Sequence, residues 1–594
     1  MLKTIIKKNS YQDSITLMLL TNSIAEMEGV QKVSIMMGTP ANKDILAAGG
    51  LGTEELAAAG PNDIAMVMDL ADDKLADAVL SNIDAFLAAQ GQKADAGSGV
   101  NNKIARTWDQ ALDILPDANL AMFSIPGAYV EHEAMTALDK GMHVFIFSDN
   151  VPLEAEKRLK QRATAKGLLV MGPDCGTAII NGVPLAFANK VPLGNIGIVG
   201  ASGTGIQEIS TQIAQLGGGV SHALGTGGRD LNSQIGGATM QAALAALEAD
   251  SNTSCIVVVS KPPAAQVKAA LLAAIQGISK PVVVHFLGEE ITEHHAGCYF
   301  AATLEQAARY AVALSQGKPV PSGASELPVC TDVVATKARG IRGLYTGGTL
   351  ACEAALMLEK ALGSQGDHQS HVDGFMFNRQ GHVIIDLGDD VYTQGKPHPM
   401  IAPLNRVAFI NELAQDAEAG VVLLDFVLGY GAHEDMAGAT APAIRQVRAA
   451  AQEQGRELIF IASICGTADD PQGFAAQKAV LEEAGVIIAP NNACAVGCAL
   501  QSIGLTYRYE EYPVVGDDFG KDEVLPDVSA PIKELLEAGP KVINVGLASF
   551  TAPFVQLGAG FVQFDWQPVA GGDLELVRVL AFLDDFGKGL EVSA

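Results

Sequence analysis

A glycine-rich turn in the first half of the chain combines residue types that could hold phosphate. Ser202-Gly203-Thr204-Gly205 follows an apolar run, IGIVG at 196–200, and opens a stretch with helical spacing. Backbone amides and the helix dipole attract an anion at such a point. The glycines allow close approach, and the two hydroxyls can donate to phosphate oxygens. We therefore predict phosphate binding at these four residues, with an ordinary helix cap as the alternative.

A second turn of this kind lies in the other half of the chain. The apolar run LLDFV at 423–427 leads through Leu428 into Gly429-Tyr430-Gly431-Ala432 and then His433. Its amides could also bind an anion, so we predict that the two turns face one phosphate. The alternative is a tight turn without a ligand. His433 is a candidate catalytic residue, although a histidine in this position more often lies on the surface or caps a helix.

Acidic residues cluster in DLGDDVYTQGKPHP at 386–399. Asp386, Asp389 and Asp390 with His398 could bind a divalent ion such as Mg²⁺ or orient a substrate. Equally, the aspartates could cap the loop while the prolines stiffen it. Lys396 is a further candidate for contact with an anionic substrate, and a solvated surface lysine is the simpler interpretation.

The elements that must position these residues alternate regularly. Short Val- and Ile-rich runs such as HVFIFS (143–148), IGIVG (196–200) and CIVVVS (255–260) are typical of buried parallel strands. Stretches with apolar residues three and four apart separate them, as in helices that cover a sheet. The pattern predicts α/β domains with doubly wound sheets.

Composition narrows the class of protein. The 594 residues carry a formal net charge of -28, and no Lys/Arg-rich run provides a surface for nucleic acid or anionic lipid. No uncharged apolar stretch reaches about 18 residues, so we expect neither a membrane span nor a signal peptide, and a cytoplasmic location. The eight cysteines lack C-x-x-C spacing, which favours reduced structural thiols.

Two motifs in the first half resemble the α-subunit of succinyl-CoA synthetase. GLLVMGPDCGTAII followed by GNIGIVGASGTGIQE matches that family's GPNC and SxSGTLxYE in order and spacing. SIPGAYVEHEAMTALDKGMHVFIFSDNVP also looks like its CoA-binding portion, and the similarity covers about residues 100–317. The resemblance implies CoA, or another nucleotide, as cofactor. It assigns the contacts to these residues: Pro126, Gly127, Gly172, Pro173, Asp174 and Cys175.

The second half is similar to the ligase domain of the β-subunit of the same enzyme, through GLYTGGTLACEAALML and VVLLDFVLGYGA. Chains that fuse both modules form the FdrA family, and this chain is identified as a member. Its signatures are SKPPA (260–264), LYTGGTLACEA (344–354), IDLGDDVYTQGKPHPMI (385–401) and LLDFVLGYGAHED (423–435). The tail at 542–576 resembles the start of a large partner protein encoded beside FdrA, which implies a protein partner and an oligomer.

Departures from succinyl-CoA synthetase bear on mechanism. That family carries phosphate on a histidine within HAGAIIAGG, oriented by a glutamate in a GEIGG turn. Here the turn reads Ser260-Lys261-Pro262-Pro263, without the glutamate, although His295 keeps the histidine and is a candidate catalytic residue. An exposed loop histidine is the alternative. No room remains for an ATP-grasp domain of about 200 residues.

Three interpretations of function follow. The resemblance to FdrA implies a subunit of an oxamate carbamoyltransferase, which converts oxalurate and phosphate to oxamate and carbamoyl phosphate in purine and allantoin catabolism. A second is an ADP-forming acyl-CoA synthetase with a phosphohistidine. The third is a non-enzymatic subunit that senses CoA or nucleotide. The missing glutamate favours the first over the second.

The predicted fold is α/β and multidomain. It comprises a Rossmann-like CoA-binding domain and two flavodoxin-like ligase domains of succinyl-CoA synthetase type, behind a small α+β domain. The predicted division of the chain is 1–75 for the α+β domain, 76–192 for CoA binding, 193–317 for the α-like ligase domain, 318–341 for a linker, 342–512 for the β-like ligase domain and 513–594 for the tail.

Overall fold

The computed structural model describes most of the chain. Outside it lie residues 1, 9, 11, 13, 26, 49, 61–62, 73–74, 97–103, 292, 296, 321–326, 328–339, 364–372, 395, 510–511, 516–524, 526, 569–575, 577–578 and 580–594. Most of the predicted linker and parts of the predicted tail fall among them. No described helix combines the length and apolar composition needed to cross a bilayer.

The N-terminal part is the small α+β domain that we predicted. Its antiparallel sheet has the order β1-β3-β2. Helices α1 and α4 cover one face, and α2 and α3 cover the other. The predicted boundary at residue 75 would separate α4 from this domain, although α4 packs in its core. The elements are β1 (Leu2–Lys7), α1 (Ser14–Ala25), β2 (Val30–Met37), α2 (Pro40–Ala48), α3 (Glu54–Ala57), β3 (Ile64–Leu70) and α4 (Leu75–Ala96).

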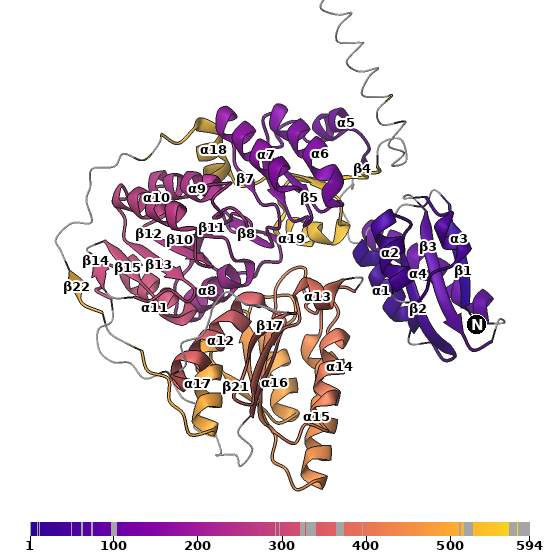
Figure 1. Cartoon of the computed structure of the whole chain (residues 1–594). Helices are drawn as coiled ribbons and strands as arrows, with labels where there is room; N and C mark the ends of the chain where they lie inside the picture. Colours follow the sequence, from indigo (N-terminus) through magenta and orange to yellow (C-terminus); the bar gives the residue numbers. More distant parts are fainter. Residues whose placement is uncertain are drawn as a thin grey trace, which may run out of the picture.

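The Rossmann-like sheet follows, with the order β4-β24-β23-β5-β6-β7 and every pairing parallel. Two of its strands come from the predicted tail, which Figure 1 shows as a yellow segment among purple strands. The elements are β4 (Ile104–Ala105), α5 (Trp108–Ile114), β5 (Leu120–Phe123), α6 (Gly127–Asp139), β6 (His143–Ile146), α7 (Leu153–Lys166), β7 (Val170–Met171), α18 (Ala530–Ala538), β23 (Val542–Val545), a 3₁₀ turn (Ala548–Thr551), α19 (Ala552–Leu557) and β24 (Phe561–Phe564).

A nine-stranded sheet forms the next module, in the order β22-β14-β15-β13-β12-β10-β11-β8-β9. Its central strands are buried along their whole length because helices cover both faces. The elements are β8 (Thr177–Ile180), β9 (Val183–Ala186), β10 (Leu193–Gly200), α8 (Gly203–Gln215), β11 (Val220–Gly225), α9 (Ala238–Ala249), β12 (Cys255–Ser260), α10 (Ala265–Gln276), β13 (Val282–Phe286), β14 (His294–His295), β15 (Cys298–Phe300), α11 (Leu304–Ser315) and β22 (Val514–Val515).

The last module has a six-stranded sheet in the order β17-β18-β16-β19-β20-β21. Only β17 runs antiparallel to its neighbour. The elements are β16 (Gly340–Tyr345), α12 (Gly348–Leu362), β17 (Phe375–Arg379), β18 (His382–Asp386), α13 (Asp390–Thr393), α14 (Leu404–Glu412), β19 (Ala419–Val427), α15 (Met436–Glu453), β20 (Ile459–Cys465), α16 (Phe474–Glu483), β21 (Val486–Ala489) and α17 (Asn492–Ser502).

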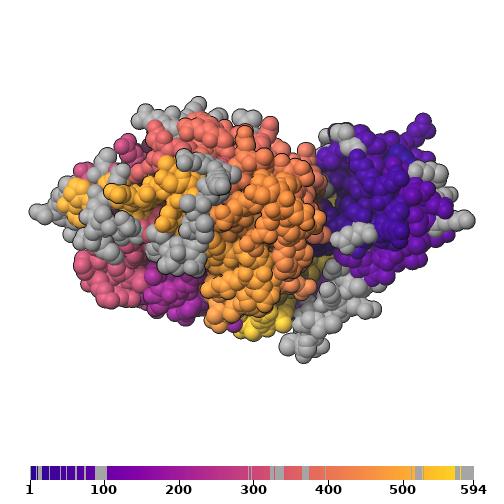
Figure 2. Space-filling view, turned by 90° about the horizontal axis from the view of Figure 1, so that it is seen from below, coloured from indigo at the N-terminus to yellow at the C-terminus, as the bar shows by residue number. Residues whose placement is uncertain are grey.

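Shared hydrophobic cores join the three larger modules. One core combines residues of the nine- and six-stranded modules, and another combines the nine-stranded and Rossmann-like modules. The cores of the N-terminal domain contain only its own residues, and Figure 2 shows it as an indigo lobe at one end of the molecule. The fold class is therefore as predicted, while the exact domain boundaries remain predictions.

Candidate active site

The first predicted phosphate turn has the expected local structure. Ser202 is the N-cap of α8, and its Oγ accepts a hydrogen bond from the Gly205 amide at 3.2 Å. A Cβ on Gly205 would lie 2.5 Å from that same Oγ, so a side chain there would displace the capping hydroxyl. Both interpretations of the turn, helix cap and anion cradle, therefore fit its geometry.

The helix that faces this turn is α12, which corrects our pairing of the two turns. The Oγ atoms of Ser202 and Thr349 lie 2.6 Å apart. The Thr349 amide donates to the Oγ1 of Thr204 at 3.4 Å. In the described part of the chain, no acceptor is found for the amides of Gly203, Thr204 and Gly348. The N-termini of two helices from different modules thus meet. Figure 1 shows α8 and α12 side by side.

A buried ion pair between Asp425 and Arg406 fixes the turn that precedes α12. Asp425 accepts hydrogen bonds from the amides of Thr346 and Gly347, both at 2.7 Å, and from the Thr346 hydroxyl at 3.0 Å. Arg406, fully buried, lies 3.1 Å from the same carboxylate. Burial raises the pKa of Asp425, and the Arg406 charge opposes that shift. This arrangement fixes the turn that precedes α12 and leaves the amide of Gly348 free.

The predicted acidic residue Asp386 stands beside that amide. A Cβ on Gly348 would be 2.5 Å from its Oδ2, and the Gly388 amide donates to its Oδ1 at 2.9 Å. Burial raises the pKa of Asp386 to about 7. Burial likewise lowers the pKa of His398, which borders Gly388, to about 4. At neutral pH the site therefore holds a partly protonated carboxyl group and a neutral imidazole.

Asp389 and Asp390 have a different role from the predicted metal ligands. Asp389 caps α13 and accepts from the Val391 amide at 3.0 Å, and Asp390 is the first residue of that helix. Among the described residues, no group of three His, Cys, Asp or Glu side chains is arranged to hold a metal ion. The turn-capping alternative is the correct one for Asp389, because its carboxylate is used by the helix amide.

Two charged residues of the other modules complete the surroundings. Part of the Asp174 side chain is exposed, and loss of solvent around its carboxyl group raises the pKa to about 6, with the Asp149 carboxylate adding to the shift. Lys261, exposed at the end of β12, lies near enough for its charge to oppose the pKa shifts of Asp174 and Asp386. All three modules thus contribute polar groups around the two helix ends.

The other predicted cofactor contacts lie along the carboxyl edge of the Rossmann-like sheet. Pro126 and Gly127 begin α6, and a Cβ on Gly127 would lie 2.2 Å from the Asp149 carbonyl oxygen. Gly172 and Pro173 follow β7. Cys175 is buried, and burial raises the pKa of its thiol to about 12, so it packs as an inert thiol. Their assignment to a cofactor remains a prediction.

Two amides of the second glycine turn donate to protein acceptors. The amides of Gly429 and Tyr430 donate to the Gln472 side chain at 3.0 Å and to the Ala188 carbonyl at 2.9 Å. A Cβ on Gly431 would be 2.8 Å from the Phe187 ring. The turn that includes Ala432 therefore docks one module against another. His433 accepts from the Asp435 amide at 3.0 Å, as a local capping residue does.

His295 lies at the wrong end of the sheet for phosphate transfer at α8. It pairs with Cys298, which pairs with the first residue of β13, whereas α8 follows the carboxyl end of β10. Four strand spacings separate β14 from β10, or roughly 19 Å at about 4.8 Å each. The Glu293 carboxylate lies 3.7 Å from its ring. This placement does not support a phosphohistidine at the candidate site.

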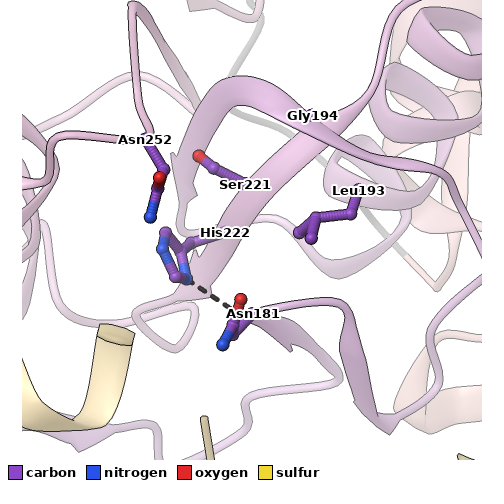
Figure 3. Close-up of a pocket in the computed structure, with 6 residues that line it drawn as sticks. All are labelled: Asn181, Leu193, Gly194, Ser221, His222 and Asn252. Carbon is purple, nitrogen blue, oxygen red and sulfur yellow. Dashed lines mark hydrogen bonds between the residues drawn. The ribbon is translucent and has the colours of Figure 1, made fainter. Parts of the chain in front are cut away.

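A recess of about 330 Å³ at the amino ends of β10 and β11 is a separate feature. Figure 3 shows His222 and Asn181 in its wall, joined by a hydrogen bond of 3.1 Å from the Asn181 amide to His222 Nδ1. Asp250 also contacts His222, at 3.4 Å. No predicted site residue lines this recess, and it opens on the opposite end of the sheet from α8.

Three family models match parts of the chain. One described as AllF, heavy metal-associated domain, matches residues 1–103, a CoA binding domain matches 193–288, and a CoA-ligase domain matches 344–501. The CoA-binding match lies C-terminal to 76–192, where we predicted that domain. The uncharacterised protein YahF of Escherichia coli K-12 is 41% identical over 504 residues, covering 82% of this chain and 96% of YahF. The chain belongs to the FdrA-type family.

More distant relatives of this FdrA-type chain are ligase subunits. The α-subunit 2 of an ADP-forming succinate–CoA ligase of Archaeoglobus fulgidus is 29% identical over 29% of the chain and 60% of the subunit. The α-subunit of malate–CoA ligase of Methylorubrum extorquens is 28% identical over 30% and 62%. A solved dinucleotide-forming acetyl-coenzyme A synthetase of Ca. Korarchaeum cryptofilum matches 66% of this chain and 85% of its own length, with 15% identity and a TM-score of 0.29.

Sequence reasoning missed the role of the turn before α12. Thr346-Gly347-Gly348-Thr349 joins a buried strand to a helix, as Ser202-Gly203-Thr204-Gly205 does. The signal was present in LYTGGTLACEA. We assigned the facing turn to 429–432 instead because the sequence does not reveal which helix of the second module meets α8.

Proposed function

We propose that this chain is the subunit of a group-transfer enzyme that binds phosphate and forms or consumes an acyl or carbamoyl phosphate. The proposal rests on one observation: the N-termini of α8 and α12 face each other with unpaired amides. Preorganised donors of this kind stabilise the oxyanion charge of a phosphoryl or acyl transfer. The most specific form is the oxamate carbamoyltransferase reaction, which the family resemblance implies.

In that reaction phosphate attacks the carbamoyl carbon of oxalurate. A new oxygen–carbon bond forms, the carbon–nitrogen bond to the oxamate nitrogen breaks, and that nitrogen takes up a proton. Asp386 is partly protonated near neutral pH and can supply the proton. The amides of Gly203, Thr204 and Gly348 would hold the phosphate, and Lys261 would attract an anionic carboxylate.

A second candidate is an acyl-CoA ligase, because the chain matches a CoA-ligase domain and the α-subunits of two CoA ligases. Such an enzyme needs an ATP-binding subunit in trans and a phosphate carrier. The distance of His295 from α8 weighs against this candidate.

The test is reconstitution of the chain with candidate partner subunits, followed by ³¹P NMR. Oxalurate and phosphate should yield carbamoyl phosphate. Thr349→Val removes the hydroxyl that meets Ser202 and should reduce the rate at least tenfold, while Thr349→Ser should restore most of it. Formation of an acid-labile phosphoprotein from ATP and CoA, lost in His295→Ala, would instead establish the ligase.

A further inference from the structure

His398 lies in the loop between α13 and α14, and its backbone is fixed by several hydrogen bonds. Its carbonyl oxygen accepts from the amides of Ile401 and Ala402, at 2.8 and 3.0 Å. The preceding carbonyl, of Pro397, accepts from the Asn405 side chain at 2.6 Å. Because a proline also stands on each side of His398, the loop holds this residue in place before any ligand arrives.

One further bond fixes which ring nitrogen of His398 carries the proton. The Met400 amide donates to Nδ1 at 3.2 Å. A nitrogen that accepts from an amide has a free lone pair, so in the neutral ring the proton is on Nε2. Burial lowers the pKa of this histidine to about 4, which keeps the ring neutral at physiological pH. His398 therefore presents a neutral Nε2–H donor.

The Nε2 atom of His398 lies at the candidate site. A Cβ built on Gly388 would be 2.4 Å from this atom, 3.0 Å from the Thr346 carbonyl oxygen and 3.1 Å from Asp386 Oδ1. The other carboxylate oxygen of Asp386 would be 2.5 Å from a Cβ on Gly348, at the N-terminus of α12. The imidazole donor thus stands on one side of the Asp386 carboxyl group, and the helix amide stands on the other.

A substrate atom can reach this donor. Within the residues that the structure describes, no acceptor is found for the Nε2–H group, and His398 is partly exposed. Gly388 keeps the adjoining space open, since a side chain there would collide with the ring. In the proposed transfer, helix amides hold the phosphate and Asp386 protonates the leaving nitrogen, which leaves the carbonyl oxygen of the substrate without a partner.

We propose that His398 is a catalytic residue of that transfer, and that its neutral imidazole donates a hydrogen bond to the carbonyl oxygen of the substrate. This inference rests on the proposed function. As the phosphate oxygen bonds to the carbonyl carbon, the electron pair of the C=O π bond moves to the carbonyl oxygen, where the Nε2–H group stabilises the negative charge. The pair returns as the carbon–nitrogen bond breaks, and Asp386 gives its proton to the departing nitrogen. The imidazole keeps its own proton throughout, so His398 acts as an electrophile and not as an acid or a base.

Two substitutions separate this catalytic role from a structural one. His398→Asn keeps an oxygen that can accept from the Met400 amide but removes the donor at the Nε2 position. Its kcat, in the ³¹P assay with reconstituted partners, should fall about 100-fold or more, as for loss of one oxyanion donor, while KM for phosphate stays within about threefold. His398→Gln places an amide N–H near the Nε2 position and should recover about tenfold or more of that loss.

The reverse order of activity would overturn the proposal. If His398→Asn is as active as wild type and His398→Gln is inactive, the ring serves only the Met400 amide. The proposal also fails if the wild-type pH profile has a limb that disappears in His398→Gln, since an acid or a base titrates during the reaction and a neutral donor does not.

The protonation state of His398 can be measured without turnover. In ¹⁵N-histidine NMR spectra of the full chain, its ring signals, identified by their loss in His398→Gln, should show the neutral Nε2–H tautomer from about pH 6 to 8. An imidazolium ion or the Nδ1–H tautomer in that range would overturn the donor role. The expected tautomer in a reconstituted wild-type enzyme that forms no carbamoyl phosphate would overturn the proposed reaction instead, and with it the catalytic role of the residue.

Discussion

The chemical role of a single residue in this protein depends on its burial and position more than on its charge. Asp386 combines a nine-tenths buried side chain with a free helix amide next to it, and its pKa of about 7 follows mainly from loss of solvent. His295 has a suitable chemical group and an unsuitable position. Residue type alone therefore does not show which of these two side chains takes part in the reaction.

Asp386→Asn should change how stability depends on pH. The folded-state pKa of about 7 exceeds the ordinary 3.8, so the stability associated with Asp386 is fully present below about pH 4 and is lost as pH rises through 7. The difference in the free energy of unfolding between the asparagine variant and wild type should therefore shift in favour of the variant by roughly 2–4 kcal/mol between pH 4 and pH 8. Urea unfolding at both pH values measures the difference, and parallel curves for the two proteins would contradict it.

His295→Ala should leave phosphate transfer within about twofold of wild type, because the side chain lies several strands away from α8. The ³¹P assay with reconstituted partners measures the rate. A loss of a hundredfold or more, with the fold intact by circular dichroism, would return this histidine to the mechanism.

At the scale of elements, two helices from different modules form the site. Their facing ends depend on close approach at glycine, since any side chain on Gly348 would reach Asp386. Strands, helices and the first glycine turn were predictable, because apolar periodicity and turn residues are local signals. The pairing of α8 with α12 was not, since it depends on how two modules pack. The phosphate role of Gly429 and Gly431 remains a prediction.

Gly348→Ala tests this packing. The added methyl group would lie 2.5 Å from Asp386 Oδ2, so α12 or the carboxylate must shift. Phosphate affinity, measured by calorimetry, should fall about tenfold or more. Gly560→Ala is the matched control, because its Cβ would meet its neighbours at 3.5 Å or more. Equal phosphate affinity in the two variants would show that Gly348 is not part of the anion site.

The whole molecule comprises one joined body of three modules and an N-terminal domain with its own cores. The tail was predicted as a separate segment because sequence periodicity gives no information on strand partners 400 residues away. Instead β23 pairs with β5, and the Lys541 amide donates to the Asn119 side chain at 2.8 Å.

Truncation should therefore have opposite effects at the two ends. Removing residues 540–594 takes two inner strands, β24 and β23, out of the Rossmann-like sheet, so the protein should aggregate or lose a thermal transition. Removing residues 1–96 should leave the melting of the remainder nearly unchanged, because the N-terminal cores are self-contained. Differential scanning calorimetry of both deletion variants measures these thermal transitions. A normal melting curve for the C-terminal deletion would mean that β23 and β24 are dispensable.

The pairing of β5 with β23 also has a consequence for biosynthesis. Asn119 and Lys541 are separated by 422 positions. At about 5–20 residues per second, a ribosome needs roughly 20–80 s to make the second partner after the first. Throughout that interval β5 has an open edge, where a nascent chain is exposed to strand-to-strand aggregation. This sheet can therefore fold only after almost the entire chain has been synthesised.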